Sequence, residues 1–305
     1  MKNNSKLLII LSFFSIYIIW GSTYLLNKIA VSEISPLLLS AIRFICAGFL
    51  ILLIAKLLNY KLSITKKQIL NSIIAGFLFL VYGNGVFVWA LRYIDSSFAA
   101  LLASTQPLFV LFLLRLIDGK KMQTKSIIGI FLGILGMYLL INQKGISTQE
   151  NSLLGVFMIL SCVLSWSYGS VFVSKADLPK NFFVSTGYQM FFSGIFLLTS
   201  SILFNEVWIL PSEITFKAQI SLLLLIIFGS ILAFTAFNYL LKVVSPEKVS
   251  TSAYVNPVVA MFLGWYFLGE EFTAQSIIAA IILLIGVYFI TSRKRQSKII
   301  SKKTM

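Results

Sequence analysis

Ten long apolar segments constrain this chain more than any other feature of its sequence. A helix needs about 20 apolar residues to cross the hydrocarbon core of a bilayer, and ten windows of that kind follow one another with short polar connections. These windows predict an all-α integral membrane protein with ten transmembrane helices, at about 7–27, 36–58, 69–91, 96–117, 125–142, 152–174, 182–204, 217–241, 248–268 and 275–291.

The composition agrees with lipid as the main solvent. Hydrophobic residues make up 58% of the 305 residues and charged residues only 11%, whereas a soluble domain carries about 25% charged residues. The net charge of +15 is typical of nucleic-acid binders. Here, however, the cations lie between apolar segments instead of along one folded surface, so we expect the lipid bilayer and not a nucleic acid as partner.

The distribution of the cations predicts the orientation. With both termini and every second connection in the cytoplasm, that side holds twenty of the 25 Lys and Arg residues, while seven of the ten acids fall on the other side. Cytoplasmic loops are enriched in Lys and Arg. We therefore expect a multi-pass protein of the bacterial inner membrane with both termini in the cytoplasm, and a basic cytoplasmic tail at 293–305.

The sequence matches itself at two fixed shifts. A shift of 150 residues places Gln106-Pro107 on Asn256-Pro257 and Gly136 on Gly286. A shift of 146 residues places Trp20 on Trp166, Arg43 on Gln189 and Gly48 on Gly194. We interpret the chain as two five-helix repeats, at 1–145 and 146–292. Because each repeat has an odd number of spans, the second copy is expected to be inverted.

Inverted repeats are a recurring transporter architecture, with the substrate site near the midplane where the repeats meet. Swapping the conformations of the two repeats would turn a cavity that is open to one side into one that is open to the other. The symmetry therefore favours an alternating-access transporter of a small molecule. A membrane scaffold without transport activity can also arise by duplication and stays an alternative.

An enzyme is not expected from this composition. There is no His in the chain, which removes the usual proton shuttle, the commonest metal ligand and every nucleophile–His arrangement. Cys46 and Cys162 lie far apart inside apolar segments, so neither a disulfide framework nor a cysteine metal motif is predicted. We expect no cofactor, no metal and two buried, unreactive thiols.

Several motifs resemble the EamA-type permeases of the drug/metabolite transporter superfamily. Their order and spacing carry the resemblance from residue 12 to residue 290, more strongly in the second half. The motifs are Trp20-Gly21-Ser22-Thr23-Tyr24, Ala41-Ile42-Arg43-Phe44, Pro107-Leu108-Phe109, the run 253–260, and Leu268-Gly269-Glu270.

The resemblance implies a ten-helix bundle with both termini in the cytoplasm, a central cavity, and export of amino acids or other small metabolites. One departure is visible. The Gly-Glu that the family carries after its fourth helix is Gly119-Lys120 here, although Gly269-Glu270 is kept after the ninth. Because this position is at the membrane surface, we expect the change to affect topology and packing more than the cavity.

Arg43 is the most unusual residue within the predicted spans. It lies about seven residues into the second span, which is about 10 Å at 1.5 Å per residue, and a charge at this depth is costly unless it faces protein or water. Its planar guanidinium suits recognition of a substrate carboxylate or phosphate. Alternatively, Arg43 is structural and reaches helix carbonyls or Glu33. Gln189 adds a polar group at the repeat-related position.

Two amide–proline pairs lie in the middle of the fourth and ninth spans. Pro107 and Pro257 remove the hydrogen bond to the carbonyl four residues earlier. With Gln106 and Asn256, these carbonyls would suit a substrate ammonium, or the prolines would be paired hinges on which the halves rock. The other interpretation is that neighbouring groups simply repair the backbone.

Further candidates for substrate binding come from small and aromatic residues. The Gly83-Asn84-Gly85 sequence in the third span would either unwind to line a cavity or allow close helix packing. The remaining candidate cavity walls are Trp20, Tyr24, Trp89, Trp166, Asn238 and Tyr239. Repeat symmetry distinguishes Trp20 and Trp166 from aromatic residues of the interfacial belts.

The lack of acidic residues in the predicted spans bears on whether transport is coupled to protons. No Asp or Glu falls clearly within a predicted span, although proton-coupled carriers commonly use such a group. We therefore hypothesise facilitated diffusion. Uptake or exchange of an anionic nucleotide-like metabolite is an alternative to export, because of Arg43. The substrate, the direction of flux and a homodimeric state stay open.

Overall fold

The computed structural model describes residues 2–119, 124–141, 151–210, 212–250, 252–270 and 273–291. Within these ranges the chain is helical, with no strand. Its elements are α1 (Lys2–Phe14), η1 (Ser15–Ile19), α2 (Trp20–Val31), α3 (Pro36–Leu57), α4 (Lys66–Gly76), η2 (Phe77–Val86), α5 (Phe87–Ala90), α6 (Ser96–Ala103), α7 (Gln106–Asp118), α8 (Thr124–Ile141), α9 (Ser152–Lys175), α10 (Phe182–Leu203), α11 (Phe216–Leu224), η3 (Leu225–Phe234), α12 (Thr235–Val243), α13 (Pro246–Val249), α14 (Ser252–Leu268) and α15 (Ala274–Thr291).

Seven helical segments of the described residues are long and apolar enough to cross a membrane. They are Lys6–Val31, Pro36–Leu57, Lys66–Ala90, Ser96–Ile117, Ser152–Lys175, Phe182–Leu203 and Phe216–Val243. The other three predicted windows contain shorter apolar stretches, Ile127–Gly136, Val255–Leu268 and Ala274–Gly286. The described part of the chain is therefore all-helical, with seven candidate spans, as expected of an integral membrane protein.

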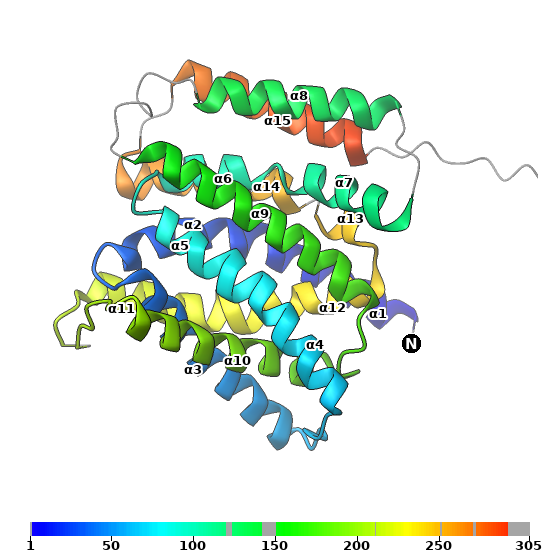
Figure 1. Cartoon of the computed structure of the whole chain (residues 1–305), viewed down its shortest axis with the longest axis vertical. Coiled ribbons are helices and arrows are strands. Elements are labelled where there is room, and N and C mark those ends of the chain that lie inside the picture. The colour runs from blue at the N-terminus through cyan, green and yellow to red at the C-terminus, as the bar shows by residue number, and fades with distance from the viewer. Residues whose placement is uncertain are drawn as a thin grey trace, which may run out of the picture.

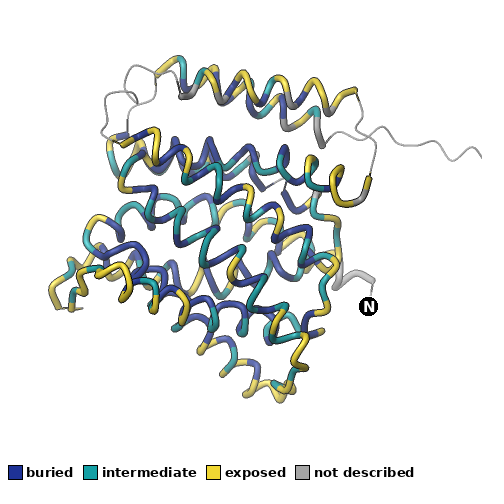
Figure 2. Tube along the Cα trace, in the orientation of Figure 1, coloured by how far each residue is buried: buried dark blue, intermediate teal, exposed yellow. Residues whose placement is uncertain are grey.

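The helices run side by side between two opposite ends of a bundle (Figure 1). Helices α8 and α15 form a pair along one edge, and α3 packs against α10 near the opposite edge. Buried residues concentrate between the helices, whereas exposed residues cover the outer surface (Figure 2). Large apolar side chains are among the most exposed, such as Phe157 at 69% and Leu203 at 74%. Lipid is the solvent that such a surface requires.

Helices α3 and α10 contact each other through two glycines. A Cβ atom at Gly48 would lie 2.6 Å from the backbone nitrogen of Phe191, and one at Gly194 would lie 2.7 Å from that of Ile45. Small residues allow membrane helices to approach this closely. Gly48 and Gly194 are the positions that the 146-residue shift pairs in the sequence.

The same two helices also end alike. The amide of Tyr60 donates to the oxygen of Ala55 after α3, and that of Glu206 donates to the oxygen of Ser201 after α10, both at 2.9–3.0 Å. Asn59 and Asn205 take left-handed conformations there, with φ of 59° and 51°. This is the helix end in which a left-handed residue lets the chain satisfy the last carbonyls.

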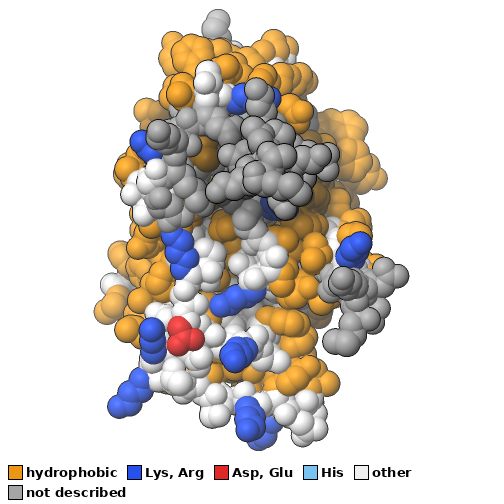
Figure 3. Space-filling view, turned by 90° about the vertical axis from the view of Figure 1, so that its right-hand side faces the viewer, with side chains coloured by type: hydrophobic (Ala, Val, Ile, Leu, Met, Phe, Trp, Pro, Cys, Tyr) orange, Lys and Arg blue, Asp and Glu red, His pale blue; other side chains and the backbone are white. Residues whose placement is uncertain are grey.

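One end of the bundle is rich in cations. Figure 3 views the end at which α4 begins and α9 and α12 end, and Lys and Arg side chains are spread over it with few acidic side chains. Lys66, Lys175 and Lys242 belong to this end. The basic tail 293–305, Lys120 and residues 142–150 lie outside the described residues.

Candidate functional site

A cavity lies between residues from both predicted halves of the chain. It has about 820 Å³ of empty volume, including the part that is open to solvent. Seven of the residues predicted from the sequence line it, namely Trp20, Tyr24, Arg43, Asn84, Gln106, Trp166 and Asn256. The remaining lining residues include Thr23, Asn27, Phe44, Phe87, Cys162, Gly229 and Phe234.

Three π-helical segments contribute to this region. They are η1, η2 and η3, which interrupt the first, third and eighth spans of the sequence prediction. Wider turns of this kind are frequent at functional sites, and they displace backbone groups from the regular hydrogen-bond ladder. Asn84 lies in η2 and Gly229 in η3, and both line the cavity.

Gly83 and Asn84 line the cavity, and Gly83 and Gly85 also lie close to neighbouring helices. The Gly83-Asn84-Gly85 sequence forms part of η2, so the α-helical ladder is interrupted there. A Cβ atom at Gly83 would lie 3.1 Å from the ring of Trp166 in α9, and one at Gly85 would lie 2.6 Å from a methyl of Leu197 in α10. Gly83 and Asn84 thus lie at the cavity, and Gly85 lies close to a neighbouring helix.

The two symmetry-paired tryptophans contact each other at the cavity wall. The ring centroids of Trp20 and Trp166 are 5.5 Å apart and their planes are at 87°, an edge-to-face arrangement. The Nε1 atom of Trp20 donates to the oxygen of Gly229 at 3.2 Å. Trp20 is therefore fixed by a carbonyl of η3, and its ring joins the two halves of the chain.

Arg43 extends from α3 into the same region and is only 4% exposed. Its Nε donates to the hydroxyl of Ser230 at 2.6 Å, and Nη1 is 3.4 Å from Oδ1 of Asn27. The predicted partner Glu33 is not used, because its carboxylate accepts bonds from the amide and hydroxyl of Thr215 instead. Arg43 is thus held by neutral groups.

The two amide–proline pairs differ in their surroundings. The helix breaks at Ser104 and Thr105, and Pro107 lies in the first turn of α7. Pro257, by contrast, lies inside α14. The terminal amide of Asn256 has one atom 2.8 Å from the oxygen of Tyr17 and 3.0 Å from that of Ile16, which assigns the NH₂ group to that side. Asn256 therefore joins α14 to η1.

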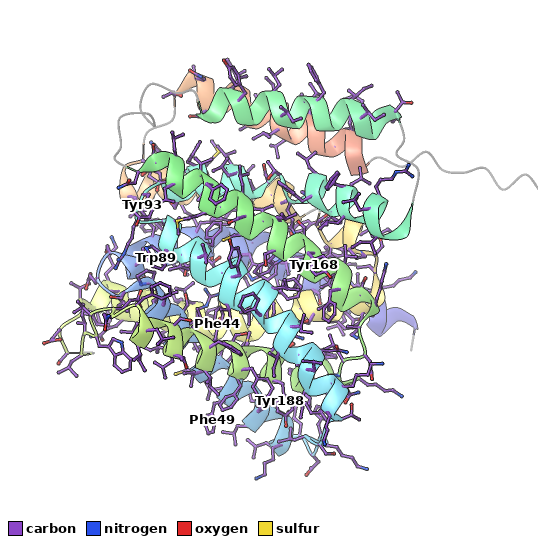
Figure 4. The ribbon with its side chains drawn as sticks, in the orientation of Figure 1. Phe44, Phe49, Trp89, Tyr93, Tyr168 and Tyr188 are labelled. Carbon is purple, nitrogen blue, oxygen red and sulfur yellow. The ribbon has the colours of Figure 1, made fainter. Side chains whose placement is uncertain are left out.

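Four residues predicted as candidate binding or wall residues lie outside the cavity lining, namely Trp89, Gln189, Asn238 and Tyr239. Tyr239 packs edge to face on Phe182, with centroids 5.5 Å apart. Gln189 is fully buried and donates to Ser185 and to Oδ1 of Asn238, at 3.1 and 3.3 Å. Asn238 in turn donates to the oxygen of Phe234 at 3.2 Å. The ring of Trp89 packs on Phe204 with centroids 5.7 Å apart. Figure 4 shows Trp89 toward the end of its helix, apart from the cavity residue Phe44.

Sequence reasoning missed Asn27 and Gly229. Asn27 is an amide in an apolar span and is 3% exposed, so the rule that intramembrane polar groups face protein or a cavity would have identified it. Gly229 gives no comparable signal. A Cβ atom there would lie 2.9 Å from Thr23 and 3.1 Å from Nη2 of Arg43, so its small size leaves room for the guanidinium.

At the end opposite the cationic one, three carboxylates bind helix N-termini of the other predicted half. Glu270 accepts bonds from the amides and hydroxyls of Ser96 and Ser97 at the start of α6. Glu206 accepts from the amides of Leu37 and Leu38 in α3 at 3.0 and 2.8 Å. A carboxylate at a helix N-terminus satisfies free amides and interacts favourably with the helix dipole.

The third of these carboxylates is Glu33, which binds the N-cap residue of α11. The side chain and the backbone amide of Thr215 both donate to it, and they hold the pKa of Glu33 below its ordinary value. Nearby, partial removal from water raises the pKa of Asp95, and the like charge of Glu270 adds to this, while Lys28 opposes it. The contacts of Glu270, Glu206 and Glu33 therefore stabilise the packing of the two predicted halves at this end.

Metal chemistry finds no support among the residues that the structure describes. No three side chains of His, Cys, Asp or Glu lie close enough together to hold a metal ion there. Cys162 is buried and its thiol contacts the oxygen of Tyr82 at 3.3 Å, while Cys46 is half-buried. The site is therefore one of aromatic rings, amides and a single guanidinium.

The EamA-like transporter family matches this chain twice, over residues 7–142 and 153–292. The chain belongs to the EamA-like transporter family. The protein named "Uncharacterized inner membrane transporter YedA", from Escherichia coli K12, is 35% identical over 283 residues, which cover 92% of this chain and 90% of that protein. A "Probable amino-acid metabolite efflux pump" of Salmonella typhimurium is 26% identical, over 90% of this chain and 91% of the pump.

A solved structure described as "Crystal structure of protein" has the same fold as this member of the EamA-like family. The two superpose with a TM-score of 0.67 at 18% identity, over 92% of this chain and 94% of the other. At this identity the likeness concerns the fold alone. The predicted resemblance to EamA-type permeases is confirmed by the family match.

Proposed function

We propose that this chain is an alternating-access transporter that exports a small organic metabolite, an amino acid or a drug-like compound, across the bacterial inner membrane. The observation that carries the proposal is the cavity. Its wall contains residues from both segments that match the family, such as Trp20 from 7–142 and Trp166 from 153–292. A binding site between two repeats is what alternating access requires. The names of the relatives, a transporter and an efflux pump, agree with it.

The proposal includes ten spans in two inverted halves, 1–145 and 146–292. Helices α8 and α15 have 18 residues each, which is about 27 Å at 1.5 Å per residue, close to the thickness of the hydrocarbon core. Gly48 with Gly194, and Asn59 with Asn205, have the same structural roles one 146-residue shift apart. Five spans per half would place the helix ends at Asn59 and Asn205 on opposite sides of the bilayer.

Cysteine labelling tests this topology. In a Cys46→Ser, Cys162→Ser background, Asn59→Cys and Asn205→Cys introduce one thiol each at the matched ends of α3 and α10. With both termini in the cytoplasm, an impermeant maleimide applied to intact cells should label position 205 and not position 59. In inside-out vesicles the pattern should be reversed. Labelling of both positions from the same side would refute the inverted repeat.

Flux in proteoliposomes tests the transport function. Liposomes that contain the purified protein should show counterflow of a radiolabelled compound from a screen of amino acids, nucleobases and nucleotides. Trp166→Ala, in the cavity wall, should reduce this flux, whereas Trp265→Ala, which is 56% exposed, should not. A chain that shows neither flux nor ligand-dependent thermal stabilisation would be a scaffold.

A second candidate rests on Arg43, whose charge at the cavity suits an anionic substrate. Uptake or exchange of a nucleotide-like metabolite would show as counterflow of nucleotides in the same screen. Facilitated diffusion belongs to the proposal for either substrate. It predicts that an imposed proton gradient does not drive accumulation of the substrate against its own gradient, and sustained accumulation would contradict it.

A further inference from the structure

The guanidinium of Arg43 has unused donor capacity next to the cavity. An arginine side chain carries five N–H donors. Among the described residues, Nε binds Ser230 and Nη1 binds Asn27. The charge also lies near an aromatic ring, since Cζ is 4.9 Å from the ring centroid of Phe44. Nη2 and one N–H of Nη1 therefore remain free for a ligand.

No acid compensates this charge in the described part of the chain. Arg43 forms no ion pair there, and the lining residues of the cavity include no Asp or Glu. A buried cation without a counter-ion is costly, because the protein interior replaces the water that would otherwise solvate the charge. An anion in the cavity would supply the missing charge.

The lining carries one positive charge and no second one. Arg43 is the only charged residue among the lining residues. Its counterpart under the 146-residue shift is Gln189, which is neutral and bonded to Asn238 instead. One negative charge on the ligand would therefore be neutralised. A second negative charge on the ligand, such as that of a phosphate monoester, would have no positive partner among the lining residues.

The rest of the lining suits an apolar or aromatic body. Trp20 and Trp166 present indole rings, and Phe87 and Tyr24 form another edge-to-face pair with centroids 5.6 Å apart. Amide and hydroxyl side chains also line the cavity, and among them Asn84 has an Oδ1 atom without a hydrogen-bond partner among the described residues. That acceptor suits an N–H group of the ligand.

We propose that the cavity binds small monocarboxylates, with the carboxylate on Arg43 and an apolar or aromatic body against Trp20 and Trp166. The guanidinium fork matches the two oxygens of a carboxylate, which a lysine would not match equally well. This assignment names the substrate class of the proposed transporter, and so rests on that function. Its test measures binding, which does not require flux.

Isothermal titration of the full-length protein in detergent at pH 7 tests the assignment with three matched probes. They are 3-phenylpropionate, its neutral amide 3-phenylpropionamide, and phenyl phosphate. We expect the carboxylate to bind at least about tenfold more tightly than the amide, because one charge-assisted pair in a buried site is worth at least one factor of ten. Equal binding of acid and amide, tighter binding of phenyl phosphate, or no binding of any probe would overturn the assignment.

Substitution of Arg43 identifies the residue responsible. Arg43→Gln introduces a neutral glutamine, the residue type that Gln189 has at the repeat-related position. It should abolish the preference for the carboxylate while the amide binds as before. Arg43→Lys keeps the charge without the fork and should keep part of the preference. Arg92→Gln is the control, because Arg92 is an exposed arginine outside the cavity lining, and it should bind like the wild type.

Each failure has its own signature. A full carboxylate preference in a folded Arg43→Gln protein would overturn the role of Arg43. If Arg43→Gln does not fold, the comparison of acid and amide in the wild-type protein and in Arg43→Lys still decides the proposal. Carboxylate binding without any flux would refute transport and leave the anion site standing. Flux that does not distinguish acid from amide would refute the anion site alone.

Discussion

Trp20 and Trp166 meet edge to face at 5.5 Å across the boundary between the two predicted halves. Each ring is also part of a larger aromatic group, since both pack on Phe237, with centroids 4.9 and 5.7 Å away. The contact therefore joins equivalent positions of the repeat in one wall of the cavity. Its geometry leads to the first prediction.

Loss of either indole should weaken ligand binding. Trp20→Ala removes aromatic contacts worth about 0.5–1.5 kcal/mol, which corresponds to a Kd about two- to tenfold weaker. Trp166→Ala should have an effect of similar size, because the two rings share the wall. Titration with 3-phenylpropionate measures the change. Trp265→Ala is the matched control, and an equal loss in that exposed variant would show that the effect is not specific to the cavity.

Gly229→Ala should act on Arg43 without removing any polar group. The new methyl would lie 3.1 Å from Nη2 of Arg43 and 2.9 Å from Thr23, so the guanidinium or η3 must shift. We expect the affinity for a carboxylate to fall by about three- to tenfold, because the productive geometry of the anion contact is lost. The affinity for the matched amide should change less.

The control for this variant is Gly133→Ala in α8. A methyl there would also be crowded, at 2.5 Å from Leu108, but Gly133 does not line the cavity. It should alter thermal stability while leaving the ratio of acid to amide affinity unchanged. An altered ratio in Gly133→Ala, or an unchanged one in Gly229→Ala, would contradict the interpretation.

Glu270→Gln should destabilise the protein by about 2 kcal/mol, since bonds to a charged acceptor are the strong ones. The side chain is 9% exposed and accepts from the amides of Ser96 and Ser97 at 3.0 and 3.2 Å, and from both hydroxyls. A glutamine has one acceptor oxygen and no negative charge for the helix N-terminus. Thermal unfolding in detergent measures the loss.

Glu213→Gln is the appropriate comparison for this cap. The carboxylate of Glu213 also accepts a backbone amide, from Leu210 at 2.8 Å, but within its own exposed loop. We expect its substitution to change the stability by less than about 0.5 kcal/mol. Equal effects of the two substitutions would contradict this prediction. The contact of Glu270 with α6 would then stabilise the fold no more than the local contact of Glu213 with Leu210.

The apolar spans were predictable because hydrocarbon requires both length and apolar composition. The inward position of Arg43 was predictable as well, because a charge in a span must face protein or water. Its partners were not. Ser230 lies 187 residues away in the sequence. A serine in an apolar span does not indicate which donor will form a hydrogen bond to its hydroxyl.

Repeat symmetry identified equivalent positions in the sequence but not the partners of their side chains. It paired Trp20 with Trp166, which do meet. It also placed a second polar group, Gln189, at the position related to Arg43, and Gln189 is bonded to Asn238 and lies outside the cavity lining. The NH₂ group of Gln189 donates to Ser185 and Asn238, whereas the bonds to Ser230 and Asn27 leave three of the five N–H donors of Arg43 for another partner. Side-chain chemistry, which the repeat does not conserve, decided the outcome.

Acidification should weaken the contact between Glu33 and Thr215. The hydroxyl and amide of Thr215, at 2.6 and 2.7 Å, lower the pKa of Glu33 below its ordinary value of 4.5. A group whose pKa is depressed by folding stabilises the protein above its unfolded-state pKa, and this contribution is lost as the pH falls through the folded-state pKa.

Below pH 4.5, therefore, the thermal stability of the wild type should fall more steeply than that of Glu33→Gln. The two profiles should run parallel near pH 7, where Glu33 stays ionised. Parallel profiles throughout the acid range would show that the contact does not depend on the charge.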